Sequence, residues 1–155
     1  DLADIILTNL SIFKDTADKK GIKVNFTQIG NSRAFFDRDL MDIIVRNLLS
    51  NAMKFTPRGG RISILLKDKS MTHDGTSIKF CDNGVGIPEE KQKKLFTATE
   101  IESTPGTENE KGTGFGLKLC HELVKINGGT LSVESREGDG TCFTIILPDS
   151  TTQNG

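Results

Sequence analysis

Apolar residues recur every three to four positions in three stretches of the chain, which is the period of an amphipathic helix. The first stretch, residues 1–20, ends before Gly21, a residue that commonly closes a helix. The second, residues 37–55, begins at Asp37, whose side chain suits a helix N-cap. The third covers residues 116–127 and is followed by two glycines. The buried stripes of the first two helices are expected to be Leu2, Ile5, Ile6, Leu10, Phe13 and Ala17, and Leu40, Ile43, Ile44, Leu48 and Ala52.

Alternating apolar and polar residues predict strands between these helices. The segments with this pattern are residues 23–28, 34–36, 61–67, 77–81, 130–134 and 141–147. Pro88 favours the start of a short helix that runs to residue 96. The polar residues 69–76 indicate a hairpin loop, and residues 97–112 indicate one long mobile loop.

The order of these elements predicts the fold class. The strands arrive as hairpins with helices between them, which favours an α+β fold. We expect a two-layer α/β sandwich, in which a mixed, mostly antiparallel sheet is covered on one face by about three helices. One domain is expected over residues 1–148, followed by a disordered tail over residues 149–155.

Composition narrows the class of protein only slightly. The chain has 155 residues, 35% of them hydrophobic, and a net charge of −1, which fits one globular domain. No apolar run approaches the roughly 20 residues of a bilayer span. No basic stretch supports nucleic-acid binding, so we expect none. The chain opens at Asp1 without a methionine, and we expect it to be a piece of a longer protein.

The three cysteines, Cys81, Cys120 and Cys142, are too far apart for metal-ligand spacing. Their odd number fits reduced thiols in a cytosolic protein. Two of them stand beside or inside strand-like apolar runs. We therefore expect reduced side chains that act as small buried hydrophobic residues.

One face of the second helix carries Asn47, Asn51 and Lys54, at spacings of four and seven. A polar line on an amphipathic helix is commonly only its solvated side. Asparagine, however, is a weak helix former, so two of them suggest another purpose. A carboxamide oxygen can ligate Mg²⁺, which often takes one or two protein ligands beside substrate phosphates. A lysine one turn further on can neutralise a phosphate.

The segment 82–88, Asp-Asn-Gly-Val-Gly-Ile-Pro, follows a predicted strand. An ordinary turn is one interpretation. The other is a ligand site, because Gly84 and Gly86 let a flat ligand approach the backbone. The Asp82 carboxylate is only an acceptor, so it can bind the amino group of adenine and would repel the carbonyl oxygen of guanine.

A glycine cluster precedes the third helix. It consists of Lys111, Gly112, Thr113, Gly114, Phe115, Gly116 and Leu117. Glycine-rich backbone at a helix N-terminus suits phosphate binding. A dinucleotide-binding fingerprint is the nearest rival, with Glu134 as its acidic residue, but the preceding residues 107–110 do not resemble a strand. The sequence also contains no phosphate-binding P-loop.

Taken together, four segments resemble the N, G1, F and G2 boxes of sensor histidine kinases. They are residues 47–55 (NLLSNAMKF), 82–87 (DNGVGI), 95–96 (LF) and 112–117 (GTGFGL), in that order. The resemblance covers residues 1 to about 148 and implies a Bergerat-type ATP-binding fold, shared with DNA gyrase and Hsp90. It implies that Asp82 holds the adenine amino group, that Gly84 and Gly86 shape the pocket, and that Thr141 lies on the adenine side. Asn51 would ligate Mg²⁺, Lys54 and Lys111 would lie near the phosphates, and the glycine cluster would line the triphosphate under a lid of residues 97–111.

The resemblance also implies a reaction. ATP-hydrolysing relatives carry a glutamate four residues before the Mg²⁺ ligand, and this chain has Asn47 there, which cannot act as a general base. We therefore expect transfer of the γ-phosphoryl group of ATP to a histidine on a separate dimerisation domain, and from there to a response regulator. Neither His73 nor His121 has the sequence context of that acceptor. The fragment is expected to be a monomer and a cytoplasmic domain, and its parent a homodimer that can lie in the bacterial inner membrane.

Some positions depart from the family pattern. The F box continues as Thr-Ala-Thr-Glu over residues 97–100 instead of Pro-Phe and a basic residue, and the lid is acidic. These departures leave open a degenerate nucleotide-binding or docking module without kinase activity. An ATPase or a serine-directed kinase of the same fold is disfavoured by Asn47.

Overall fold

A computed structural model describes residues 1–31, 33–69, 75–96, 106–107 and 116–148 of the chain. Its elements are α1 (Leu2–Lys20), β1 (Lys23–Ile29), α2 (Arg38–Phe55), β2 (Arg61–Lys67), β3 (Thr76–Asp82), α3 (Glu89–Gln92), α4 (Gly116–Ile126), β4 (Thr130–Arg136) and β5 (Gly140–Leu147). The predicted tail, residues 149–155, and all of the predicted lid except residues 106–107 lie outside the described residues.

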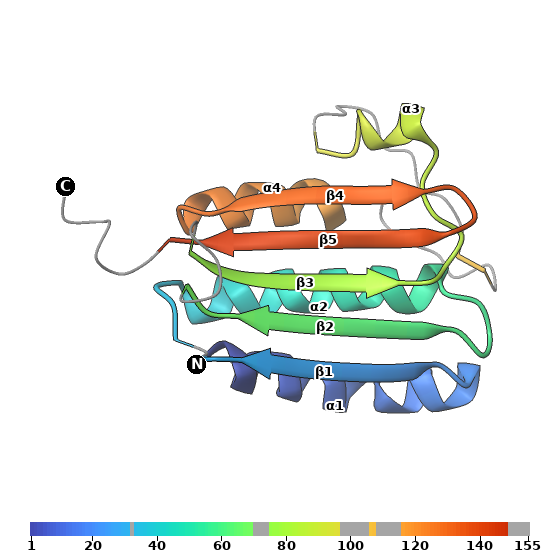
Figure 1. Cartoon of the computed structure of the whole chain (residues 1–155), viewed down its shortest axis with the longest axis horizontal. Helices are drawn as coiled ribbons and strands as arrows, with labels where there is room; N and C mark the ends of the chain where they lie inside the picture. The colour runs from blue at the N-terminus through green and yellow to red at the C-terminus, as the bar shows by residue number, and fades with distance from the viewer. Residues whose placement is uncertain (32, 70–74, 97–105, 108–115, 149–155) are drawn as a thin grey trace.

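The five strands form one mixed sheet in the order β1-β2-β3-β5-β4 (Figure 1). Strands β2 and β3, and strands β4 and β5, are antiparallel hairpins, and β3 and β5 pair antiparallel in the middle of the sheet. Only β1 and β2 are parallel, since α2 connects them and returns the chain to the same end of the sheet.

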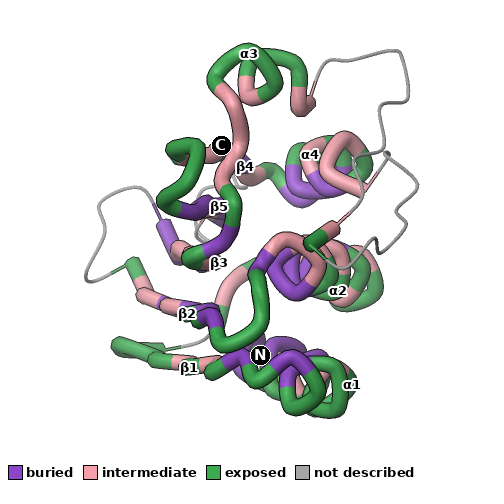
Figure 2. Tube along the Cα trace, turned by 90° about the vertical axis from the view of Figure 1, so that its right-hand side faces the viewer, coloured by how far each residue is buried: buried purple, intermediate pink, exposed green. Residues whose placement is uncertain are grey.

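The three long helices α1, α2 and α4 all lie on one face of the sheet, so the molecule has two layers (Figure 2). The main core lies between the layers and is filled by branched aliphatic residues such as Ile6, Ile44, Leu48, Ile78 and Ile145, all at most 1% exposed. The predicted α+β sandwich is thereby confirmed, including its mostly antiparallel sheet and three covering helices.

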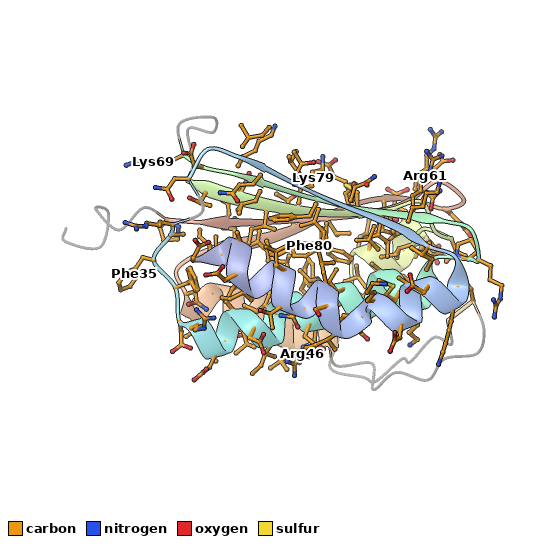
Figure 3. All side chains as sticks on the ribbon, turned by 90° about the horizontal axis from the view of Figure 1, so that it is seen from below. Phe35, Arg46, Arg61, Lys69, Lys79 and Phe80 are labelled. Atoms are coloured by element: carbon orange, nitrogen blue, oxygen red, sulfur yellow. A yellow bond between two sulfur atoms is a disulfide. The ribbon has the colours of Figure 1, made fainter. Side chains whose placement is uncertain are left out.

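The opposite face of the sheet is open. Arg61 and Lys79 point away from the helices, whereas Phe80, next to Lys79 in β3, points between the layers (Figure 3). This alternation follows from the pleat of the strands, whose successive side chains lie on opposite faces.

Among the helices that the structure describes, none combines the length and the apolar composition of a membrane span.

The helix ends agree with the sequence signals. The Asp37 carboxylate accepts a hydrogen bond from the Leu40 amide at 3.0 Å and caps α2. Gly21 ends α1 in the left-handed region, at φ 64°, where a side chain would be strained.

One predicted strand is absent, and two predicted elements end more than one residue from the predicted position. Residues 34–36 form no strand, because Ala34 and Phe36 pack against the core from an irregular segment and the Asn127 side chain accepts the Asp37 amide at 2.6 Å. The short helix predicted to reach residue 96 ends at Gln92, followed by turns. Strand β4 is longer than expected and extends to Arg136.

The prediction of three reduced cysteines was also wrong. Cys81 of β3 and Cys142 of β5 form a disulfide, because register places them directly opposite each other, with their Cα atoms 4.1 Å apart. They are half-buried on the open face. Cys120 alone behaves as expected, as a free and fully buried side chain of α4. Burial raises the pKa of the Cys120 thiol to about 12.

Candidate functional site

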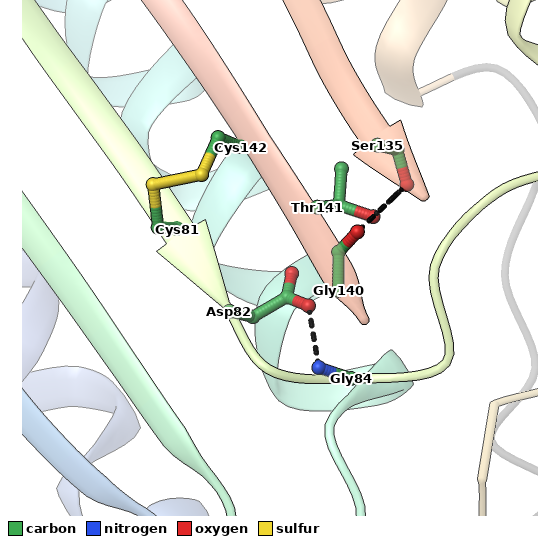
Figure 4. Close-up of a disulfide and its surroundings, with 7 residues drawn as sticks. All are labelled: Cys81, Asp82, Gly84, Ser135, Gly140, Thr141 and Cys142. Atoms are coloured by element: carbon green, nitrogen blue, oxygen red, sulfur yellow. Dashed lines mark hydrogen bonds between the residues drawn. A yellow bond between two sulfur atoms is a disulfide. The ribbon is translucent and has the colours of Figure 1, made fainter. Parts of the chain in front are cut away.

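The carboxylate of Asp82 lies at the end of β3, where the strand enters the glycine-rich turn (Figure 4). Its Oδ1 atom accepts the Gly84 amide at 2.9 Å, and the backbone amide of Thr141 in β5 also donates to the carboxylate. These bonds fix the carboxyl group in one orientation, while an ionised carboxylate has room for about four such bonds. Acceptor capacity therefore remains for a ligand.

Burial raises the pKa of Asp82 above its ordinary value of 3.8, and the amides of Gly84 and Thr141 oppose this shift. Desolvation is the largest cause. Among the described residues no cation pairs with this half-buried carboxylate, which is costly to the fold, and such groups concentrate at functional sites.

Ser135 of β4 joins this site, and the sequence analysis missed it. Its hydroxyl donates to the Gly140 carbonyl at 2.8 Å and accepts the Ile87 amide at 2.8 Å. Because its one proton is used for Gly140, the Thr141 hydroxyl, 2.8 Å away, must be the donor between the two hydroxyls (Figure 4). Ser135 therefore ties the glycine-rich turn to the β4–β5 hairpin. Only the β4–β5 register, which the sequence did not establish, could have revealed this.

The two glycines of the turn are required by close backbone approaches. A Cβ atom at Gly84 would overlap the Phe55 carbonyl oxygen at the end of α2. Gly86 has φ 72° and lies against the Arg136 carbonyl. The turn is thus held between α2 and the β4–β5 hairpin. The predicted adenine-side residues Asp82, Gly84, Gly86 and Thr141 are brought together here.

The polar face of α2 reaches this turn at the C-terminal end of the helix. Asn51 and Lys54 are half-buried, and Lys54 Nζ lies 5.0 Å from the centre of the Phe55 ring. Asn47, one turn earlier, donates its amide to the Ile43 carbonyl at 2.9 Å. A Cβ atom at Gly116, the first residue of α4, would lie 3.2 Å from Asn47 Oδ1. The start of α4 and the polar face of α2 therefore adjoin each other.

The predicted phosphate-binding residues are described only in part. Gly116 and Leu117 are the first residues of α4, and Leu117 packs against the main core. Lys111, Gly112, Thr113, Gly114 and Phe115 lie outside the described residues, so their assignment stays a prediction.

A buried lysine, which no sequence pattern predicted, supports the end of α2. Lys20 is 4% exposed, and its ammonium group donates to the Met53 and Thr56 carbonyls at 2.9 and 3.0 Å and to the Thr107 hydroxyl at 2.8 Å. The Thr107 amide donates to the Lys54 carbonyl at 3.0 Å. A cation at a helix C-terminus is favoured by the helix dipole. This contact holds Thr107 against the last turn of α2.

A hollow of about 330 Å³ opens at the adenine-side residues. It is lined by Asp82, Glu134, Ser135, Arg136, Asp139, Gly140, Thr141 and Cys142. A larger hollow of about 410 Å³ lies between α1 and β1 and contains none of the predicted site residues. We take the smaller hollow as the candidate site, because the polar groups of Asp82, Ser135 and Thr141 converge there.

The fit of a Mg²⁺ ion rests on Asn51. Within the described residues there is no cluster of three histidine, cysteine or acidic side chains that could hold a metal. The side-chain amide of Asn51 makes no hydrogen bond to any of the described residues, so its oxygen is available to a ligand. One neutral oxygen ligand fits an ion that is otherwise held by water and phosphates.

A family described as "Histidine kinase-, DNA gyrase B-, and HSP90-like ATPase" matches residues 36–151. Adaptive-response sensory kinase SasA of Parasynechococcus marenigrum is 34% identical over 116 residues, which are 75% of this chain and 30% of that protein. SasA of Prochlorococcus marinus subsp. pastoris is 36% identical over 120 residues, 77% of this chain and 32% of that protein. The chain thus corresponds to about 30% of these relatives' length.

Comparison with solved structures points to the same family. The catalytic domain of histidine kinase ThkA superposes with a TM-score of 0.81 at 26% identity, over 96% of this chain and 95% of that one. The mycobacterial sensor histidine kinase MprB superposes with a TM-score of 0.75 at 25% identity, over 96% and 95% of the two chains. The arrangement of α2, the glycine-rich turn and the sheet is therefore that of histidine kinase catalytic domains.

Proposed function

Because the chain belongs to the histidine kinase-, DNA gyrase B- and HSP90-like ATPase family, we propose that it binds Mg-ATP and donates the γ-phosphoryl group to a histidine on a separate dimerisation domain. The observation that carries this proposal is the Asp82 carboxylate, oriented by two backbone amides beside an α2 face that offers amides and a lysine but no general base.

Adenine recognition follows from the chemistry of Asp82. Its carboxylate offers only acceptors, which suit the amino group of adenine and oppose the carbonyl of guanine. The backbone bonds to Gly84 and Thr141 leave the carboxylate little freedom to rearrange. Such a preformed acceptor costs little entropy on binding.

The phosphates would lie between the polar face of α2 and the start of α4. Asn51 would hold the Mg²⁺ ion, which neutralises phosphate charge when bound. Lys54 would contact the phosphates, with Lys111 and the glycine cluster of residues 112–117 around them. The N-terminal amides of α4 point their partial positive charge toward this region.

Asn47 explains why transfer is favoured over hydrolysis. Its amide nitrogen is used for the Ile43 carbonyl, and its oxygen faces Gly116. An amide cannot remove a proton from water at neutral pH. Phosphoryl transfer needs mainly positioning and charge neutralisation, so the histidine of another domain can supply the nucleophile. The histidine nitrogen forms the new bond to phosphorus as the bond to the ADP oxygen breaks.

The partners are inferred from the relatives. A structure of ThkA is described as a complex with the response regulator protein TrrA. We propose that the parent of this chain likewise forms a homodimer through its dimerisation domain and passes the phosphoryl group on to a response regulator. The chain itself would be a monomeric cytoplasmic domain.

Calorimetric titration with ATP and with GTP, each with and without Mg²⁺, tests the proposal. We expect binding that is selective for ATP and sensitive to Mg²⁺, without appreciable hydrolysis. If neither nucleotide binds, the chain is a docking module and the proposal is wrong. Rapid hydrolysis of ATP would instead indicate an ATPase.

A further inference from the structure

The Cys81–Cys142 disulfide joins β3 and β5 at the edge of the proposed nucleotide site (Figure 4). Its neighbours Phe80 and Phe143 are buried in the core, while both cysteines are half-buried on the open face of the sheet. The bridge therefore fills no space in the core. Sheet pairing between β3 and β5 continues over seven residue pairs without it.

The next pair in the register is Asp82 and Thr141. These are the residues whose carboxylate and backbone amide are hydrogen-bonded to each other in the site. The bridge therefore fixes the two strands one residue away from the contact that orients the Asp82 carboxylate. Breaking or forming the disulfide therefore bears directly on the contact between Asp82 and Thr141.

We propose that Cys81 and Cys142 are a reversible thiol–disulfide site, through which a low-molecular-weight thiol and its disulfide control the affinity for ATP. This inference rests on the proposed function. In the oxidising direction, the thiolate of one cysteine attacks the small disulfide, forms a mixed disulfide and releases one thiol. The second cysteine then displaces the second thiol and forms the Cys81–Cys142 bond. Two protein thiols and one small disulfide become one protein disulfide and two small thiols.

Access distinguishes this pair from the third cysteine. Cys142 lines the open hollow of about 330 Å³, so a small thiol can approach it. Cys120 is fully buried, and its pKa is raised to about 12, so it forms almost no thiolate at neutral pH. Since the thiolate is the reacting species, exchange is confined to Cys81 and Cys142.

The direction of the effect follows from the position of the bridge. With the bond formed, the ends of β3 and β5 are held together and the Asp82–Thr141 contact is preorganised. Reduction leaves the hydrogen-bonded ladder but allows the strand ends to move. We expect the reduced chain to bind ATP roughly three- to tenfold more weakly, since the loosened groups must be ordered on binding.

The test compares the oxidised chain with the chain reduced by dithiothreitol, by calorimetric titration with Mg-ATP. Thiol titration under denaturing conditions should find one thiol, that of Cys120, before reduction and three after it. The double variant Cys81→Ser/Cys142→Ser should bind ATP like the reduced chain and lose all response to dithiothreitol. Cys120→Ala, as the matched control, should keep the full response.

Each outcome is decisive. Equal ATP affinity of the oxidised and reduced chains overturns the inference and leaves the proposed function intact. Failure to form the disulfide in a buffer of oxidised and reduced glutathione, which supplies the small disulfide of the proposed exchange, overturns it as well. Absence of ATP binding in both states contradicts the proposed function itself, and the redox coupling with it. Circular dichroism of the double variant excludes misfolding as the cause of a weaker affinity.

Discussion

The adenine side and the phosphate side of the proposed site are built differently, although both lie at the end of the molecule where β3 and α2 end (Figure 1). On the adenine side, Asp82, Ser135 and Thr141 bond to each other or to nearby backbone. On the phosphate side, the amide of Asn51 makes no hydrogen bond within the described residues. The proposed adenine side is thus preformed by the protein, whereas on the proposed phosphate side the Asn51 amide remains available to an ion.

This difference has an energetic meaning. The Asp82 carboxylate is oriented by internal bonds and loses little entropy on binding, and its remaining acceptor capacity gives selectivity, because a wrong base leaves that capacity unpaired. A group without an internal partner, such as the Asn51 amide, interacts with the charged phosphates or their ion. It should therefore contribute to the phosphoryl-transfer step. Substitutions on the two sides should therefore separate affinity from rate.

The largest effect is expected at Asn51. Asn51→Ala removes the proposed Mg²⁺ ligand and should lower the rate of phosphoryl transfer by about 100-fold or more, while the melting temperature changes little because the side chain has no hydrogen-bond partner among the described residues. Ser50→Ala, an exposed neighbour on the same helix, is the control. Transfer at the wild-type rate in Asn51→Ala would show that the residue is no metal ligand.

Asp82→Asn should act on affinity. It replaces an acceptor by an ambivalent amide beside the adenine amino group, and we expect ATP binding to weaken roughly 10- to 100-fold, the value of one hydrogen bond to a charged group. Asp139→Asn, in the same hollow but 68% exposed in its side chain, is the control and should change little. Calorimetry with ATP and GTP provides the measurement. If Asp82→Asn keeps the ATP affinity of the parent chain, Asp82 does not contact adenine.

The pH dependence sharpens the same assignment. Burial raises the pKa of Asp82 above 3.8, so the carboxylate that adenine needs is lost as pH falls through this raised pKa. Because the folded pKa is raised, the unfolded state loses its proton first, and the charged carboxylate lowers stability as pH rises from 3.8 through the folded pKa. Asp82→Asn should remove both dependences. Affinity and unfolding are measured against pH in both proteins, and identical profiles would contradict the shift.

A smaller effect is expected at Ser135. Ser135→Ala leaves the Ile87 amide and the Thr141 hydroxyl without their acceptor, at a cost of about 1–3 kcal/mol in stability, and should weaken ATP binding severalfold. Urea unfolding measures the first effect, and calorimetry the second. Ser132→Ala, on the open face of the same strand, should change neither. A Ser135→Ala chain as stable as the parent would mean that the hydroxyl network does not organise the site.

The sequence predicted the fold well because the signals for it are local. Apolar periodicity located α1, α2 and α4, and alternation located five of the strands. It failed at residues 34–36, since three alternating residues cannot specify pairing with a sheet edge, and the Asn127 side chain takes the Asp37 amide instead.

The site shows the same division. Asp82, Gly84 and Gly86 belong to one continuous motif and could be predicted as candidates from sequence, whereas Ser135 and Lys20 reach the candidate site through contacts between distant segments. Lys20 bonds to Thr107, which is 87 residues away along the chain. The disulfide depends on the register of β3 against β5, which joins residues 61 positions apart. No local pattern contains that register.

Incubation of the chain with γ-labelled Mg-ATP and a separately purified histidine-containing dimerisation domain from its parent tests the central claim most directly. We predict label on the histidine of that domain, lost on acid treatment, with none on the chain itself and none when Asn51→Ala replaces the parent chain. Tight ATP binding without any labelled histidine would contradict the account, and would identify the chain as a nucleotide-binding module that does not transfer phosphate.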